Sequence, residues 1–459
     1  MKRTTIVLAA GQGTRMKSPL AKVLHPLLGR SMLAHLLEGL STLGADRTLV
    51  VAGHQADQVV PVAEAFGAMT VLQEPQLGTG HALMCCRQVL QGDDPSTALL
   101  VAGDVPLLPV AQVGRFWEEF QASDAPAAVV ILTLQEPWGY GRILRDGEGR
   151  LEAIVEERDA SDQQRAVKDV NSGVYFLRLP SALALLDGLG RANAQREYYL
   201  TDLVALLHQR GTPATTYRAE EPELWLGINS QAELARTAGR LREAIVRGWM
   251  DQGVTVMDPA TTWIEPGVHL APGVVLHPCV RLCGDTRIES RCEIRSFSTL
   301  MGVQLGEGTV VKENCVLEGT RTGCGCIIGP FSRTREGTEM AERVHLGNFV
   351  ETKKAKLGVG VKANHLSYLG DAAVGAGSNI GAGTITCNYD GVHKHPTILG
   401  DRVFVGSDTQ LVAPLTVGND AYIGAGTTVT KDVPAGALAI SRSPQRTIEG
   451  WAERRKRKD

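Results

Sequence analysis

Small residues and cations follow the first aliphatic segment of the chain. Thr5–Ala9 leads directly into the segment Ala10–Thr14, which contains two glycines, and Arg15 and Lys22 come soon after it. A glycine-rich loop between a strand and a helix exposes backbone N–H groups to an anion, and two cations can clamp phosphates. The loop is not the dinucleotide fingerprint, because residue 16 is Met, and no Gly-Lys-Ser/Thr makes it a Walker loop. Alone it is equally well explained as an ordinary turn.

Two further segments add weight to a nucleotide site. Gln73–Ala82 contains a second glycine-rich turn that enters a helix, and Ala102–Asp104 ends another aliphatic run. An Asp in such a place is often only a helix cap. At the carboxyl end of a central strand and near a phosphate loop, however, it can hold Mg²⁺. We therefore expect Asp104 to be a candidate metal ligand.

A second group of polar residues lies between residues 333 and 390. His365 is surrounded in the sequence by Lys, Arg, Tyr and Asn residues. A lone histidine is more often a surface residue than a base. The ordinary pKa of histidine, about 6.5, nevertheless suits general-base catalysis at neutral pH.

The elements that must position this second group have a six-residue period. The aliphatic residues that carry it are Leu399, Val405, Leu411, Val417, Ile423 and Val429, and earlier stretches show the same spacing. Six residues fit neither an α-helix nor an alternating strand, but they fit one side of a triangular coil in a parallel β-helix. Stacked coils would bring residues that are distant in sequence side by side. The break between Ile385 and Ile398 predicts an extruded loop with Asp390-Gly391 at its tip.

The N-terminal half of the chain has a different pattern of hydrophobic residues. Four short aliphatic runs, Thr5–Ala9, Leu49–Ala52, Ala98–Ala102 and Ala128–Leu132, alternate with helical stretches. This predicts a parallel or mixed sheet with helices on both faces. Ser230 and Glu233 form a capping-box pattern at the start of a linker helix of about 20 residues. We expect domains at residues 1–229 and 251–459, joined by a helix at residues 230–250.

Composition limits the remaining possibilities. The 459 residues carry a net charge of −3, with 43% hydrophobic and 21% charged residues. These values are typical of a soluble globular protein, and we expect no nucleic-acid partner and no membrane span. The basic residues Arg454–Lys458 are interpreted as a solvated terminus. Nine cysteines with irregular spacing predict reduced thiols and a cytoplasmic location.

Several motifs together carry a resemblance to a known family. They are Leu8–Met16, Lys22–His25, Gln76–Ala82, Gly103–Leu107, Gly139–Arg142, Val170–Gly173 and Gly227–Asn229. These motifs are similar to those of sugar-nucleotide pyrophosphorylases. With the hexapeptide half attached, the whole chain resembles the bacterial bifunctional N-acetylglucosamine-1-phosphate uridylyltransferases/glucosamine-1-phosphate acetyltransferases. The resemblance implies a Rossmann-like nucleotidyltransferase domain, a linker helix and a left-handed parallel β-helix of hexapeptide repeats.

The resemblance implies two reactions in one chain. Acetyl transfer from acetyl-CoA to glucosamine 1-phosphate precedes Mg²⁺-dependent uridylyl transfer from UTP, and UDP-N-acetylglucosamine and pyrophosphate result. Arg15 and Lys22 would bind the UTP phosphates, and Asp104 and Asn229 would hold Mg²⁺. The residues implied in UTP or UDP-N-acetylglucosamine binding are Leu8, Ala9, Ala10, Gly11, Lys22, Gln73, Gly78, Thr79, Ala102, Gly103, Asp104, Gly141, Glu156, Asn171 and Asn229.

The second half would carry the acetyl transfer. By resemblance His365 is the general base, and Glu351 is expected to orient its imidazole. Glucosamine 1-phosphate would be bound by Arg335, Lys353, Tyr368 and Asn379, and acetyl-CoA by Ala382, Asn388, Tyr389, Ser407, Ala425 and Arg442. The family forms trimers with active sites between subunits, so we expect a homotrimer. The sequence departs from the family pattern at Ala102, Glu336 and Asn364, where a bulkier residue, Pro and Gly are usual.

Two other interpretations remain open at this point. A glucose-1-phosphate nucleotidylyltransferase with a merely regulatory β-helix would not need the segments Asn364–Tyr368 and Thr386–Tyr389. A trimeric scaffold that binds nucleotide sugars would bind its ligand without turnover. Failure to release CoA with glucosamine 1-phosphate would favour the first of these interpretations. Substrate binding without turnover in the presence of Mg²⁺ would favour the second.

Overall fold

The computed structural model describes residues 1–91 and 96–456, so the end of the basic tail lies outside the described residues. It divides into two compact units, Met1–Leu241 and Arg242–Asp459. Helix α9 (Gln231–Asp251) contributes residues to both units. The limits predicted from the sequence, 229 and 251, lie on either side of the division. None of the helices in the described part of the chain has the length and apolarity that crossing a bilayer requires.

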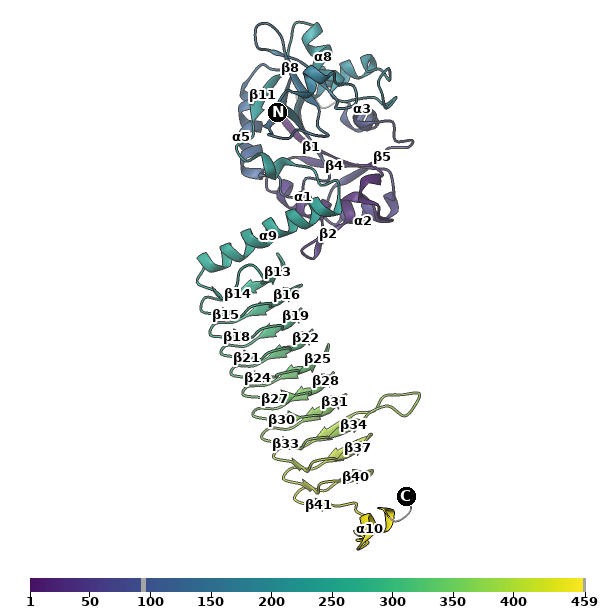
Figure 1. Cartoon of the computed structure of the whole chain (residues 1–459), viewed down its shortest axis with the longest axis vertical. Coiled ribbons are helices and arrows are strands. Elements are labelled where there is room, and N and C mark those ends of the chain that lie inside the picture. Colours follow the sequence, from purple (N-terminus) through teal and green to yellow (C-terminus); the bar gives the residue numbers. More distant parts are fainter. Residues whose placement is uncertain (92–95, 457–459) are drawn as a thin grey trace. The chain divides into compact units, whose positions relative to one another are not determined.

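The N-terminal unit is built on a mixed sheet with the strand order β11-β7-β10-β6-β1-β4-β5 (Figure 1). Strand β10 runs antiparallel to β6 and β7, and the other neighbours in this order are parallel. The hairpin of β8 (Arg142–Arg145) and β9 (Leu151–Val155) pairs with β10. All four predicted strands are confirmed. The strand bounds are β1 Lys2–Ala9, β4 Arg47–Ala52, β5 Met69–Leu72, β6 Ser96–Ala102, β7 Ala127–Thr133, β10 Asp169–Arg178 and β11 Thr215–Arg218.

Alternate residues of the central strands enter two separate hydrophobic cores. Val7 and Val50 belong to one core, whereas Ile6 and Leu49 belong to the other. Because successive side chains of a strand point to opposite faces, this places helices on both faces of the sheet, as predicted. One face is covered by α1 (Met32–Ser41), α2 (Ala56–Glu64) and α5 (Val110–Ala122), and the other by α3 (Thr79–Cys85), α4 (Arg87–Leu90), α7 (Leu179–Leu185) and α8 (Asp202–Gln209).

The C-terminal unit is a parallel β-helix. Each short strand pairs in parallel with the third strand after it, which generates three sheets along the coil (Figure 1). They run from β12 (Thr255–Val256) to β41 (Leu438–Ala439), from β13 (Trp263–Ile264) to β40 (Thr428–Val429), and from β14 (His269–Leu270) to β38 (Leu415–Val417). The strands used below are β27 His345–Asn348, β28 Glu351–Lys353, β30 Lys362–His365, β31 Tyr368–Gly370, β33 Asn379–Ile380, β34 Ile385–Cys387 and β35 Thr397–Leu399.

The predicted six-residue aliphatic series faces the interior of the β-helix. Its six members from Leu399 to Val429 are at most 4% exposed and belong to one continuous core. Between β34 and β35 the chain leaves the coil in a loop of residues 388–396, which projects from the β-helix in Figure 1. The Asp390 carboxylate accepts the N–H groups of Val392 and His393, which closes the tip at the predicted position.

Candidate active sites

The first site is a cavity of about 500 Å³ at the carboxyl ends of β1 and β6. Parallel strands end at this edge, and loops that follow them can expose backbone N–H groups to a ligand. Gly103 connects the two loops, because its N–H donates to the Leu8 carbonyl (2.8 Å). The predicted residues that line the cavity are Leu8, Ala9, Ala10, Gly11, Lys22, Gln73, Gly78, Thr79, Ala102 and Asp104.

The first loop has a specific need for glycine. Gly13 adopts φ +63°, and a Cβ there would lie 2.5 Å from Lys22 Cβ, so a side chain would displace that lysine. The segment that follows differs from the prediction, because it is only the single 3-10 turn Thr14–Met16 rather than a helix. Lys17, with φ +48°, ends this turn. The chain therefore returns to the cavity early enough for Lys22 to line it.

On the other side of this cavity, Gln73 is almost completely buried. Its Nε2 donates to the Gly78 carbonyl (2.9 Å), and Gly78 (φ +104°) packs against Glu197 and Tyr198. The hydroxyl of Thr79 accepts the Leu200 N–H (3.1 Å), which fixes the second glycine-rich turn to the segment around residue 198. Glu197 also lines the cavity, although no motif in the sequence pointed to it.

Two oxygen ligands converge on a cation inside this cavity. The Lys22 ammonium contacts the Asp104 carboxylate and donates to Asn229 Oδ1 (2.7 Å). Arg15 Nη2 donates to the same Asn229 oxygen at 2.7 Å. The four residues are thus brought together as predicted for a phosphate and metal site. A carboxylate and an amide oxygen are also a donor set that fits Mg²⁺, which commonly takes its remaining ligands from phosphates and water.

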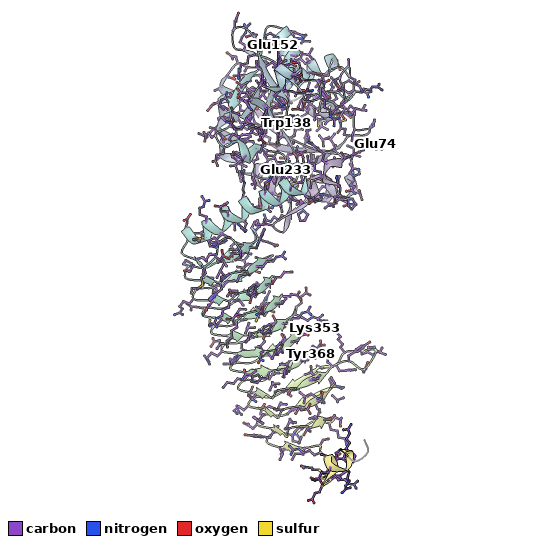
Figure 2. All side chains as sticks on the ribbon, viewed as in Figure 1. Glu74, Trp138, Glu152, Glu233, Lys353 and Tyr368 are labelled. Carbon is purple, nitrogen blue, oxygen red and sulfur yellow. The ribbon has the colours of Figure 1, made fainter. Side chains whose placement is uncertain are left out.

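Asn229 is held by a residue that sequence reasoning assigned differently. The pattern at Ser230 predicted a reciprocal capping box. Ser230 Oγ does accept the Glu233 N–H (3.2 Å), but the Glu233 carboxylate accepts the N–H of Asn229 (2.6 Å) instead of that of Ser230. Glu233 therefore fixes the backbone of a candidate metal ligand, in addition to starting α9. Figure 2 shows Glu233 at that end of the helix.

The residues predicted to contact the sugar form a separate polar group. The Gly141 carbonyl accepts the Asn171 N–H (2.9 Å), and a Cβ on Gly141 would lie 3.5 Å from Glu156 Oε1. Thr201 donates its hydroxyl hydrogen to Glu156 Oε1 (3.2 Å). Burial raises the pKa of Glu156 above its ordinary value, and nearby carboxylates, including that of Asp159, act in the same direction. The three predicted residues Gly141, Glu156 and Asn171 are therefore neighbours.

A buried arginine supports this group. Arg142 is 1% exposed, and its Nη2 lies 2.7 Å from Glu157 Oε2. It also donates to the carbonyl oxygens of Tyr140 and Arg165. A buried guanidinium with all of these partners ties the loop beside Glu156 to the β8 strand.

The second site follows one corner of the β-helix. Asn348 and His365 are paired residues of β27 and β30. The corner continues through Ala382, Ser407 and Ala425, since Asp408 N–H donates to the Ala382 carbonyl (2.7 Å) and Gly426 N–H donates to that of Ser407 (2.8 Å). The candidate base and three residues predicted to bind acetyl-CoA thus lie in one column.

The partner of the histidine differs from the prediction. His365 Nδ1 is 2.9 Å from Asn348 Oδ1, whereas Glu351 pairs with Arg335 (3.2 Å). The expectation that Glu351 orients the imidazole is therefore wrong. Glu351 begins the next sheet, where it pairs with Tyr368 in register. An amide oxygen can only accept, so in the neutral imidazole this contact places the hydrogen on Nδ1 and leaves Nε2 as the acceptor.

Three cations gather at the far end of β28, the strand that begins beyond this corner. The positive charges of Arg335 and Lys394 lower the pKa of Lys353. Lys394 belongs to the extruded loop and was not predicted, because its neighbours in space are distant in the sequence. Lys353 and Tyr368 lie close together on the β-helix in Figure 2. A cluster of three cations is suited to a phosphate group.

The remaining predicted residues lie around the same coils. Asn379 is in β33, directly beside Lys362 of β30. Asn388 donates to Asp371, and the Tyr389 hydroxyl donates to the Gly391 carbonyl (2.6 Å) at the start of the loop. The Arg442 guanidinium lies over Gly424, where a Cβ would be 3.1 Å from Nη2. The departure at Asn364 leaves His365 in register with Asn348.

Comparison with known proteins agrees with two separate transferase sites. Residues 5–168 match the MobA-like NTP transferase domain, and residues 396–431 match the hexapeptide repeat of succinyl-transferase. The fold class is therefore confirmed as a Rossmann-like nucleotidyltransferase domain, a linker helix and a left-handed parallel β-helix. The chain is a bifunctional transferase with a nucleotidyltransferase half and an acyltransferase half.

Full-length relatives define the family. The chain is 45% identical to the Bifunctional protein GlmU of Pelobacter propionicus, over 99% of this chain and 98% of that protein. It is 47% identical to the Bifunctional protein GlmU of Syntrophotalea carbinolica, over 97% and 96% of the two chains. The chain belongs to the GlmU family, which confirms the resemblance noted in the sequence. A solved UDP-glucose pyrophosphorylase complexed with UDP-glucose aligns with 53% of this chain and 100% of its own, with a TM-score of 0.43 and 16% identity.

Proposed function

We propose that the β-helix site acetylates glucosamine 1-phosphate with acetyl-CoA, and that the N-terminal site joins the product to UMP from UTP. The observation that carries this proposal is the presence of two separate constellations in one chain. One holds two cations, a carboxylate and an amide beside a small-residue loop. The other holds a histidine paired with an asparagine at one corner of the β-helix, and three cations one strand further along the coil.

In uridylyl transfer, a phosphate oxygen of N-acetylglucosamine 1-phosphate attacks the α-phosphorus of UTP. The new O–P bond forms as the bond to the bridging oxygen breaks, and the electron pair leaves with pyrophosphate. Both reactants are anions, so the contribution of the protein is to supply positive charge and alignment. Arg15 and Lys22 bind the phosphates, and the lysine leaves its oxygen partners to do so. No protein nucleophile is needed.

The same oxygens would hold the metal. Asp104 and Asn229 would hold Mg²⁺ once the Lys22 ammonium had moved onto the phosphates, and Glu233 would keep Asn229 in place. The ion, when bound, would supply positive charge that offsets the charge of the phosphates. Gly141, Glu156 and Asn171 bind the sugar, and the small-residue loop from Leu8 to Gly11, with Gln73, Gly78 and Thr79, binds the uridine.

In acetyl transfer, His365 Nε2 takes a proton from the amino group of glucosamine 1-phosphate. The amine nitrogen forms a bond to the thioester carbonyl carbon, the C–S bond breaks, and the proton is passed to the CoA sulfur. Asn348 fixes the tautomer that makes Nε2 the base. Arg335, Lys353 and Lys394 hold the sugar phosphate, Tyr368 and Asn379 hold the sugar, and acetyl-CoA lies along Ala382, Ser407 and Ala425 toward Arg442, near Asn388 and Tyr389.

A homotrimer would complete the second site. Large apolar side chains occupy the corner next to His365 and are 49–63% exposed: Phe297, Phe331, Phe349 and Leu366. Each has φ between +49° and +63°, a conformation that bulky residues rarely adopt. Phe331 and Phe349 also stack on each other, with centroids 5.3 Å apart. A row of this kind is typical of an interface, and further copies of this chain are the proposed partner.

Nine free cysteines support a reducing, cytoplasmic compartment.

Product analysis tests the proposal directly. Purified protein is incubated with glucosamine 1-phosphate, acetyl-CoA, UTP and Mg²⁺, and free CoA, pyrophosphate and UDP-N-acetylglucosamine are quantified. Omission of each substrate in turn separates the two steps. Pyrophosphate release without CoA release would contradict the acetyl-transfer assignment.

Measurement of the molecular mass in solution, with Phe349→Glu as the variant expected to disrupt the interface, tests the trimer. A wild-type monomer with full acetyl transfer would refute it.

A further inference from the structure

The buried phenol of Tyr175 lies beside the sugar-binding group and has no role in the two reactions described above. We propose that Tyr175 is a positioning residue for uridylyl transfer, whose hydroxyl fixes the Asn171 carboxamide in the orientation that receives the sugar. This inference rests on the proposed function of Asn171. It deepens that function, because it names what determines which atoms of the amide face the substrate.

The orientation of Asn171 follows from a bulge in the sheet. The register between β10 and β7 shifts between Asn171 and Tyr175, and Gly173 within the bulge has φ +81°. The Gly173 N–H points at the Asn171 side chain, 2.9 Å from Oδ1. A backbone N–H can only donate, so the amide atom that faces it must be the oxygen. The nitrogen is then directed to the Tyr175 hydroxyl, 2.7 Å away.

These two contacts use half of the hydrogen-bonding capacity of the Asn171 amide. A carboxamide has two N–H donors and two acceptor lone pairs, and Gly173 and Tyr175 use one of each. One donor and one acceptor remain in a defined direction. A sugar hydroxyl or an acetamido group both donates and accepts, so it can satisfy both remaining positions. The Tyr175 contact thus determines how the substrate-facing part of Asn171 is presented.

Burial makes the tyrosine difficult to replace with water. Tyr175 is 3% exposed and its ring belongs to the hydrophobic core on the α7 and α8 face of the sheet. Loss of the hydroxyl would leave the Asn171 nitrogen without this partner, and the bond from the Gly173 N–H to Oδ1 would remain as the other contact that holds the amide. The last torsion of Asn has broad, soft preferences, so removal of one of these two bonds loosens the orientation of the amide.

Tyr175→Phe in the full-length protein tests the inference. We expect KM for N-acetylglucosamine 1-phosphate to rise roughly three- to tenfold, the loss typical of one hydrogen bond. KM for UTP, kcat and acetyl transfer at the second site should stay within about twofold, because the change only removes an oxygen. Tyr217→Phe, in β11 of the same sheet, is the matched control, since its hydroxyl has no hydrogen-bond partner among the described residues. It should leave all constants unchanged.

A double-mutant cycle asks whether the effect passes through Asn171. Asn171→Ala should raise KM for the sugar phosphate at least as much as Tyr175→Phe does, and adding Tyr175→Phe to it should cause no further rise. An unchanged KM in Tyr175→Phe, an equal rise in KM for UTP, or a full additional effect in the Asn171→Ala background would each overturn the inference. Failure of the wild-type protein to use N-acetylglucosamine 1-phosphate would refute the proposed function instead.

Discussion

Replacement of Arg142 by Met should destabilise the N-terminal unit far more than its place in a short strand suggests. The guanidinium is buried, pairs with Glu157 and donates to two backbone carbonyls. Breaking one partner out of a buried ion pair costs about 3–5 kcal/mol. The Glu157 side chain is 22% exposed and can recover some hydration, so we place the loss near the lower end, at about 3 kcal/mol. For a unit of 241 residues that corresponds to a Tm about 6 °C lower.

Calorimetry of the full-length protein measures this change, and the acetyltransferase activity serves as an internal control. Arg145→Met is the matched variant on the same strand, because Arg145 is exposed, and it should change stability by less than about 0.5 kcal/mol. Adding Glu157→Gln to Arg142→Met should recover part of the loss, since it removes the unpaired charge. If Arg142→Met and Arg145→Met were equally stable, the buried pair would not hold the sugar-binding loop as we infer.

Three further predictions concern the two sites. His365→Ala should abolish CoA release and leave pyrophosphate release near normal, and equal loss of both activities would contradict separate sites. Asp104→Ala should remove metal-dependent uridylyl transfer alone, and a fully active variant would refute its assignment as a ligand. Glu156→Gln should raise the Tm of the N-terminal unit at pH 8 but not at pH 4, while weakening sugar-phosphate binding. A carboxyl group whose pKa is raised in the fold stabilises it when protonated, and this stabilisation is lost as pH rises through the folded-state pKa. A Tm difference that does not depend on pH would show that burial of this charge is not its cause.

The repeating elements could be predicted from the sequence because they depend on local periodicity. The six aliphatic residues from Leu399 to Val429 and residues Ala98–Val101 of the predicted run are buried in the coil and the sheet. Loop residues that belong to strong motifs, such as Lys22 and Asp104, were brought together as expected. In these cases one short segment contains the whole signal.

Contacts between distant segments could not be predicted in the same way. Asn348 faces His365 because the two strands stack with a spacing of 17 residues, and Glu351 lies on the next sheet. A six-residue period does not determine which polar residues of adjacent coils become neighbours. Likewise, Glu233 reaches Asn229 rather than Ser230 because the chain turns sharply before α9. Such pairings depend on three-dimensional register, of which a single sequence gives no direct sign.

The coil geometry also decides how the length of the C-terminal half can change. Leu282, Leu300 and Leu317 stack inward at intervals of 18 and 17 residues, on coils that precede every proposed acetyl-transfer residue. Excising one residue there would turn the next strand over and expose its apolar side, because side chains alternate along a strand. Excising one whole coil would place another of these leucines at the vacated inward position, so the buried stack would continue. The β-helix can therefore change in length only by whole coils. Coils that precede the proposed acetyl-transfer residues can be gained or lost while the coils that carry those residues stay intact.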